Sequence, residues 1–162
     1  MSDVADLIRR FHSGESAAFE TIVSTHQDDI YTLCLRVLGT DTAAEAVAEG
    51  IFITAHQAMH RLNPETPIRP WLLQLAVNDL SDKSSEDDEA SEAPHAQSAQ
   101  LNGLLQGLDM PFRLAVILRD VIGIDATEVA EILQLPIGTA RSRIHRGRLT
   151  MARSLCEHGE GY

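Results

Sequence analysis

The chain has 162 residues, of which 44% are hydrophobic and 23% are charged, a balance that is ordinary for a soluble globular protein. Its length allows one domain or two small ones, and its formal net charge of −11 opposes attraction to nucleic acid over the surface as a whole. No apolar run approaches the roughly 20 residues of a membrane span, and no signal sequence opens the chain. We therefore expect a cytoplasmic protein without membrane insertion.

Four amphipathic helices are predicted in the first half, where apolar residues recur with helical spacing. Their predicted ranges are 3–12, 15–38, 41–59 and 68–80. Gly39 stands where a helix C-terminus favours a left-handed residue, and Asp41 can cap the third helix. Such helices bury their apolar faces against one another, so the fold class we expect is an all-α bundle.

Residues 81–100 separate this bundle from the rest of the chain. The segment contains six acidic residues, one lysine and no large apolar side chain. A stretch of this composition cannot bury enough surface to offset the entropy of ordering. We therefore expect a flexible acidic linker between two small helical domains, at 1–80 and 101–162, that fold independently.

A helix-turn-helix is predicted in residues 101–162, a length of about sixty residues that can fold alone when its core is well packed. Asp109 marks the start of a first helix, which Gly123 ends. Asp125 can cap the next helix. Pro136 ends that helix and suits the first turn of the last one. Two short helices joined by a tight turn, the second of them basic, are typical of a DNA-binding domain.

The last helix sorts its residues by chemistry. At about 100° per residue, its apolar stripe contains Ala140, Ile144, Met151 and Leu155, and the face beside the stripe carries Thr139, Ser142, Arg143 and Arg146. An arginine guanidinium can donate two hydrogen bonds to the edge of a guanine in the major groove, so we expect Arg143 and Arg146 to read bases. Arg141 and Arg148 flank the other side of the stripe, where phosphates would run. The alternative is a solvated basic face.

The other chemistry-bearing residues indicate no catalytic or metal site. Cys34 and Cys156 lie far apart, and Cys34 falls on an apolar helical face, so we expect both to be reduced. The seven histidines are scattered, and we interpret them as residues that bind no metal. No catalytic triad, glycine-rich phosphate loop or carboxylate pair emerges. We expect neither an enzyme nor a bound cofactor.

Residues 108–155 pass from an apolar helix through Ala-Glu-Ile-Leu to Pro-Ile-Gly-Thr-Ala-Arg-Ser-Arg-Ile-His-Arg-Gly-Arg. This stretch resembles the fourth region of the extracytoplasmic-function sigma factors of the sigma-70 family. The LuxR-type response regulators, which have a related helix-turn-helix, are the alternative. The positions that match the sigma pattern are Pro136, Gly138, Thr139, Ser142, Arg143, His145, Arg146 and Arg148. The DNA-binding residues that we expect are Thr139, Arg141, Ser142, Arg143, His145, Arg146 and Arg148.

The first half resembles the second sigma region, with several departures. Matching stretches are Ala18-Phe19-Glu20, Ile30-Tyr31 and Arg69-Pro70-Trp71-Leu72. The family's third helix usually reads Ala-Glu-Asp-Leu-Val-Gln-Glu-Val-Phe and holds the clamp helices of RNA polymerase. Three of those polymerase-facing positions are changed here, to Ala46, Glu49 and Gly50. The resemblance implies that the residues contacting core polymerase are Glu45, Glu49, Ile51 and Phe52.

The resemblance also implies contacts near the minus-ten promoter element. The residues it suggests are Arg69, Trp71 and Asn78, although for Trp71 we favour a core role over stacking on a flipped base. The family's basic cluster after the asparagine is absent, because Asp79, Asp82 and Glu86 follow Asn78 with a single lysine. Carboxylates in place of cations there would repel the DNA backbone.

The function that the resemblance implies is that of a sigma factor. Such a protein binds core RNA polymerase and directs promoter-specific initiation, and its C-terminal helix-turn-helix reads the upstream promoter element. The expected partners are core RNA polymerase, promoter DNA and an anti-sigma factor. The changed second region leaves an alternative, a sigma-like regulator that binds DNA or sequesters a partner with weak or no binding to core polymerase.

Overall fold

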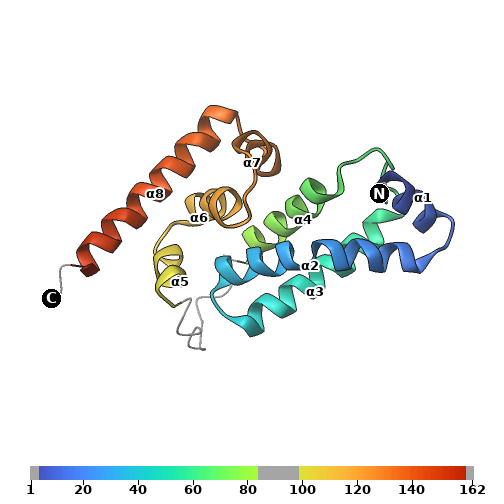
Figure 1. The fold of residues 1–162 in the computed structure, drawn as a ribbon, viewed down its shortest axis with the longest axis horizontal. Coiled ribbons are helices and arrows are strands. Elements are labelled where there is room, and N and C mark those ends of the chain that lie inside the picture. The colour runs from blue at the N-terminus through green and yellow to red at the C-terminus, as the bar shows by residue number, and fades with distance from the viewer. Residues whose placement is uncertain (1–3, 84–98, 160–162) are drawn as a thin grey trace.

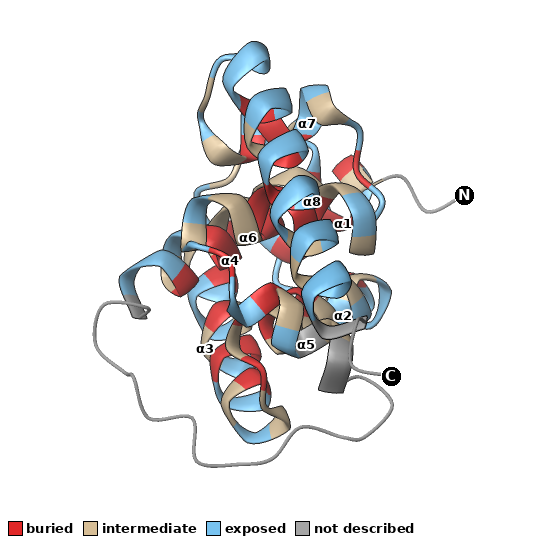
Figure 2. Ribbon diagram, turned by 90° about the vertical axis from the view of Figure 1, so that its left-hand side faces the viewer, coloured by how far each residue is buried: buried red, intermediate tan, exposed pale blue. Residues whose placement is uncertain are grey.

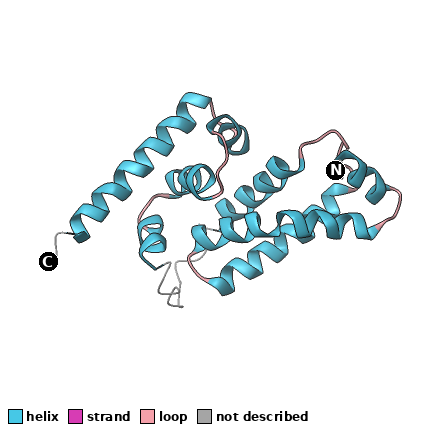
Figure 3. Cartoon of the chain, in the orientation of Figure 1, coloured by secondary structure: helices cyan, strands magenta, loops and turns pink. Residues whose placement is uncertain are grey.

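The computed structural model of the chain describes residues 4–83 and 99–159. Within those ranges every regular element is a helix (Figure 3). The predicted all-α fold is therefore confirmed for that part of the chain. The first four helices lie at one end of the long axis of the molecule, and the later ones lie at the other end (Figure 1).

The N-terminal bundle has the predicted helices. They are α1 (Val4–His12), α2 (Ser16–Leu38), α3 (Asp41–Met59) and α4 (Ile68–Lys83). The longest of them, α2, ends at Gly39, whose left-handed φ of 90° lets its N–H donate to the Leu35 carbonyl at 2.7 Å. The spacing of apolar residues therefore predicted this bundle correctly.

Two details at the helix ends differ from the predictions. The residue at the N-cap of α3 is Thr40, and Asp41 lies inside the first turn, where its carboxylate accepts a hydrogen bond from Tyr31. The predicted linker is shorter than 81–100, because α4 continues through Lys83 and the next helix begins at Ala99. The remainder of the predicted linker lies outside the described residues.

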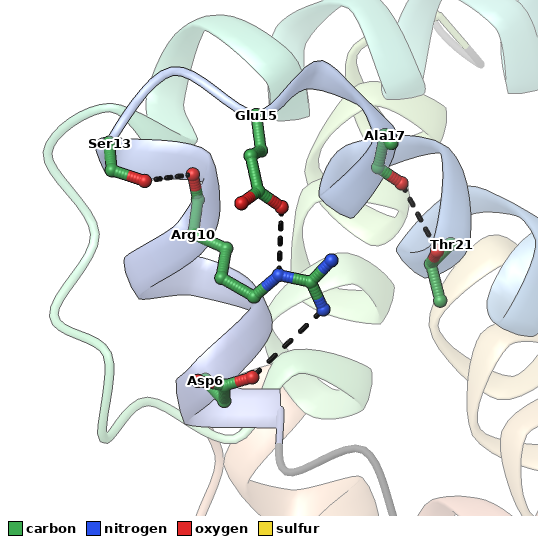
Figure 4. Close-up of polar contacts among 6 residues, drawn as sticks. All are labelled: Asp6, Arg10, Ser13, Glu15, Ala17 and Thr21. Atoms are coloured by element: carbon green, nitrogen blue, oxygen red, sulfur yellow. Dashed lines mark hydrogen bonds and ion pairs between the residues drawn. The ribbon is translucent and has the colours of Figure 1, made fainter.

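A short turn joins α1 to α2 (Figure 4). Gly14 takes a φ of 106° there, which reverses the chain within a few residues. The Arg10 guanidinium bridges the turn, with its Nε 2.8 Å from the Glu15 carboxylate and an Nη 4.0 Å from Asp6. All three side chains are exposed, so each ion pair contributes less than about 1 kcal/mol and mainly orients α1.

The C-terminal half contains one helix and one irregular turn that the sequence did not predict. Its elements are α5 (Ala99–Gln106), α6 (Met110–Val116), the π-helical turn η1 (Ile117–Val121), α7 (Ala126–Leu133) and α8 (Ile137–Gly159). The unpredicted ones are α5 and η1. As predicted, the Asp125 side chain caps α7 by accepting from the Thr127 N–H at 3.1 Å. Gln134, in a left-handed conformation, ends α7, whereas we expected Pro136 to do so.

The two halves share one hydrophobic core. In this core α4 packs against α7, and α2 packs against α5 and η1. At the C-terminus of α2, the Val37 carbonyl accepts from the Arg113 guanidinium at 2.9 Å and from the Gln106 amide at 2.8 Å. Arg113 also donates to the carbonyls of Leu105 and Leu108, both at 2.9 Å. Polar contacts from the second half thus cap a helix of the first.

The approach of α8 to α6 depends on a glycine. A Cβ atom at Gly147 would overlap the buried Val116 Cγ2 and lie 3.4 Å from the Phe112 carbonyl oxygen. We predict that Gly147→Ala lowers the free energy of unfolding. Overpacking costs about 1–3 kcal/mol, which outweighs the roughly 1 kcal/mol that alanine gains over glycine within a helix. Chemical denaturation followed by circular dichroism measures the change.

Gly50 provides the matched control. It lies inside α3, and a Cβ atom there would meet no neighbour within 4 Å. Gly50→Ala should therefore raise the free energy of unfolding by up to about 1 kcal/mol. If Gly147→Ala stabilises the protein as Gly50→Ala does, the close packing of α8 on α6 is wrong.

Candidate functional site

The first candidate surface is the outer side of α8. This helix forms one edge of the molecule and packs against α6 and α7 (Figure 1). Ala140 and Ile144 face inward and are buried, as predicted. Its other side is largely exposed (Figure 2). The exposed polar side chains on its first turns are Thr139, Arg141, Ser142, His145 and Arg146.

The structure corrects two placements on α8. Arg143 is half-buried because it lies at the edge of the apolar stripe, next to Ile144, whereas we expected it on the exposed face. Leu155 is 43% exposed although we assigned it to the stripe, since the last turns of α8 reach past α6 (Figure 1). Arg146 is therefore the better presented of the two arginines that we expected to read bases.

Arg148 is held by a carboxylate of its own chain. Its Nε donates to Asp120 Oδ2 at 2.8 Å, and its Nη2 donates to the other carboxylate oxygen. Hydrogen bonding from Arg148 lowers the pKa of Asp120, and the same contact raises the pKa of Arg148. Arg148 therefore does not present a free guanidinium in this structure, and its contact with phosphates stays a prediction.

The second candidate surface is a groove between α2 and α3. It has a volume of about 350 Å³, and its lining residues are Val23, Gln27, Asp28, Tyr31, Glu45, Ala48 and Phe52. Two of these, Glu45 and Phe52, are among the residues expected to contact polymerase. The four from α2 were missed, because a helix considered alone does not show which helix lies beside it.

Tyr31 and Asp41 form a polar pair at this groove. The Tyr31 hydroxyl donates to the Asp41 carboxylate at 2.8 Å. This hydrogen bond, with a smaller effect of burial, raises the pKa of Tyr31 to about 12. The tyrosine therefore stays neutral at physiological pH and keeps its hydroxyl proton on the bond.

The apolar residue that α3 exposes to solvent is Ile53, and not Ile51 as predicted. Ile51 is only 1% exposed and belongs to the core, so the prediction that it contacts a partner is wrong. Ile53, two residues on, is 54% exposed and was missed. Glu49, which lies outside the groove, is exposed as well. A change of two positions turns a helical residue by about 200°, which explains the difference.

The residues expected near the minus-ten element lie along α4 in different surroundings. Arg69 donates to Asp29 at 3.0 Å and to the Ile122 carbonyl at 3.4 Å, so its guanidinium is occupied at the contact between the halves. Trp71 is half-buried and packs on the core, as expected of a core residue. Asn78 is exposed. An open cationic site is therefore not formed by Arg69.

In the part of the chain that the structure describes, no group of three or more histidine, cysteine, aspartate or glutamate side chains is placed to hold a metal ion. None of the helices in 4–83 and 99–159 is long and apolar enough to cross a membrane.

Comparison with protein families matches both halves of the chain. The model of sigma-70 region 2 matches residues 22–86, and the model of sigma-70 region 4 matches residues 99–151. The first includes the α2–α3 groove, and the second includes most of α8. The chain belongs to the extracytoplasmic-function group of the sigma-70 family.

Individual relatives match along nearly their whole length. The RNA polymerase sigma-H factor of Pseudomonas aeruginosa is 28% identical, and the match covers 92% of each chain. The sigma factor SigW of Bacillus subtilis is also 28% identical, over 91% of this chain and 94% of its own.

Solved structures share the fold. CnrH in complex with the cytosolic domain of CnrY superposes with a TM-score of 0.84 at 24% identity, covering 96% of this chain and 99% of its own. The sigma factor RpoE, solved with the anti-sigma factor NepR from Bartonella quintana, gives 0.72 at 16% identity, over 85% and 96%. Both likenesses show that this chain shares the arrangement of helices of these two proteins.

The pair at the groove predicts an alkaline titration. We expect the Tyr31 phenol to ionise at a pKa of about 12, and Asp41→Asn to bring that value back toward 10.0. Because the folded-state pKa is raised, the stability that the pair contributes is complete below pH 10.0 and is lost as the pH rises through about 12. Ultraviolet absorbance titration of the parent and of Asp41→Asn measures the two pKa values, and Tyr31→Phe identifies which part of the absorbance change comes from Tyr31. An unchanged titration in Asp41→Asn would contradict the hydrogen bond.

Proposed function

We propose that this chain docks on core RNA polymerase through its N-terminal half and reads an upstream promoter element with α8. The family assignment supports a factor for transcription initiation that has no catalytic role of its own. The observation that carries the proposal is the outer side of α8, where arginines and hydroxyls are exposed on a helix whose other side is packed. Such a factor works in the cytoplasm.

The chemistry of α8 suits the DNA major groove. An arginine such as Arg146 can fork onto the O6 and N7 acceptors of guanine, and short polar side chains such as Ser142 can reach other base edges. Arg141 lies on the flank of the same exposed side, where a phosphate contact would hold the register. We assign base reading to Arg146 and Ser142, and backbone contact to Arg141.

The α2–α3 groove suits a helix that carries basic and apolar side chains. Asp28 on α2 and Glu45 on α3 provide carboxylates, and Phe52 and Ala48 provide apolar surface between the helices. On the neighbouring face of α3, Ile53 extends the apolar surface into solvent. Acidic rims and an exposed apolar centre are complementary to a basic amphipathic partner. The partner we propose is the clamp of core polymerase.

A second candidate function rests on what α3 lacks. Ala46 is exposed and Gly50 has open space around it, so neither position offers a charged group to the polymerase. This favours a sigma-like regulator that binds DNA or sequesters a partner and binds core polymerase weakly. An anti-sigma partner is proposed in either case, because the related RpoE structure contains the anti-sigma factor NepR.

One experiment separates the two functions. The tagged full chain is incubated with core RNA polymerase, the complex is captured, and transcription is measured on a template library of genomic promoters. Stable capture with transcription from a defined subset of promoters supports the sigma factor. Absence of both, with binding to DNA retained, supports the second candidate.

Base reading by Arg146 is tested by substitution. We predict that Arg146→Ala costs roughly 1–3 kcal/mol of discrimination between the matched promoter and a scrambled one. The half-buried Arg143 is the comparison within the same helix, and Arg143→Ala should cost less discrimination. Competition binding with the polymerase complex gives both values. Equal losses in the two variants would show that exposure does not identify the reading residue.

Docking by α3 is tested by adding the acids that the family carries. We predict that Ala46→Asp with Gly50→Glu tightens binding to core polymerase, because charge-assisted hydrogen bonds contribute about 1.5–3 kcal/mol each. Ala46 is exposed, and a Cβ atom at Gly50 would meet no neighbour within 4 Å. Ala46→Asn with Gly50→Gln is the control, since it adds the same volumes without charge. If the two double variants bind core equally, this face of α3 is not the docking surface.

A further inference from the structure

Among the arginines of α8, Arg148 has an unusual position. The helix carries five, namely Arg141, Arg143, Arg146, Arg148 and Arg153. Within the part of the chain that the structure describes, Arg148 is the one that forms an ion pair. Its partner, Asp120, is 28 residues away in the sequence and belongs to another element.

Asp120 reaches α8 from the π-helical turn. In η1 the Ile122 N–H donates to the Ile117 carbonyl five residues back, at 2.9 Å. The five residues from Leu114 to Leu118 are all buried, and Asp120 emerges on the surface two residues after Leu118. The irregular turn therefore delivers a carboxylate to the side of the recognition helix.

Arg148 lies on the same flank of α8 as Arg141. The two residues are seven positions apart, which is two helical turns and roughly 10 Å along the axis. Arg141 is exposed, and no ion pair holds it within residues 4–83 and 99–159. We assigned this flank to the DNA backbone, so the two arginines would face successive parts of one phosphate strand.

A carboxylate and a phosphate compete for the same guanidinium geometry. Both accept two parallel N–H donors from arginine, and the Arg148–Asp120 contact uses both oxygens of the carboxylate. While that contact persists, the Nε and Nη2 donors of Arg148 are not available to a phosphate. The side chains are 50% and 35% exposed, so water screens the pair and little of the fold depends on it.

We propose that Asp120 limits the DNA affinity of this chain by occupying Arg148, a cation that would otherwise bind a backbone phosphate. The inference rests on the proposed DNA reading by α8 and adds a residue outside that helix to it. In a chain with a net charge of −11, one fewer phosphate contact keeps binding to random DNA weak. Promoter selection then depends on the bases and on the polymerase.

The test is the salt dependence of binding to DNA of random sequence. The full chain and its variants are titrated with a short labelled duplex, by fluorescence anisotropy, from low to physiological salt. Asp120→Asn keeps the shape of the side chain and removes its charge. It should bind severalfold more tightly than the parent at low salt. Its plot of log affinity against log salt should be steeper by about 0.9, the value for one added phosphate contact.

Two controls make the result specific. Glu131→Gln removes one exposed acid from α7, and should leave the slope unchanged. Asp120→Asn combined with Arg148→Ala should return the slope to that of the parent. Arg148→Ala alone should also keep the parent slope, and it tests the proposal whatever the fold of the Asp120 variant.

Each other outcome overturns the proposal. If Asp120→Asn has the slope of Glu131→Gln, the pair only braces α8 against η1. If Arg148→Ala flattens the slope, Arg148 already binds phosphate in the parent chain. Neither result bears on base reading by Arg146, because that is measured as discrimination on a matched promoter. A loss of promoter discrimination alone, in turn, leaves the salt slopes on random DNA unchanged. If no variant binds the duplex at low salt, this inference fails, whereas base reading by Arg146 is still decided with the polymerase complex.

Discussion

The guanidinium of Arg113 is the contact on which the arrangement of the two halves depends. It donates to carbonyls at the end of α5 and to Val37 at the C-terminus of α2, where helical carbonyls have no partner within the helix. Burial lowers its pKa, partly offset by Asp109, and the carbonyls that accept from the guanidinium solvate its charge in place of water. Losing Arg113 would remove a donor from carbonyls of both halves at once, and Val37 would keep only the Gln106 amide.

Packing positions α8 relative to the contacts of Arg113. Arg113 fixes α6, and α8 lies against α6 closely enough that Gly147 has no room for a side chain. The direction of α8 then follows from the inward residues Ala140 and Ile144, which leave the hydroxyl and guanidinium groups outside. The exposed chemistry of α8 is therefore a consequence of core packing two elements away.

Local periodicity predicted most helices and the inward side of α8, because each needs only neighbours along the chain. It could not find α5, η1 or the groove. The carbonyl partners of Arg113 and the Asp120 partner of Arg148 depend on contacts between distant segments, which no spacing rule reports. Ile51 was assigned to a polymerase contact by the resemblance and not by its helical spacing, and Ile53 is the isoleucine that faces solvent. The errors in the predicted site therefore arose from contacts between segments that are distant in the sequence. The predicted helix ends differed from those of the structure by only a few residues.

The distribution of charge suggests why such a chain would act with a partner. Two of the cations expected to meet DNA, Arg69 and Arg148, have carboxylates of the same chain at hydrogen-bond distance. On the proposed DNA contacts of Arg69 and Arg148, each carboxylate would cancel a contact that releases counterions from DNA. Arg141 and Arg146 remain exposed on α8 against a net charge of −11. Two cations on a strongly acidic chain give little affinity for DNA. Stable binding to DNA would therefore require the polymerase to supply the remaining contacts.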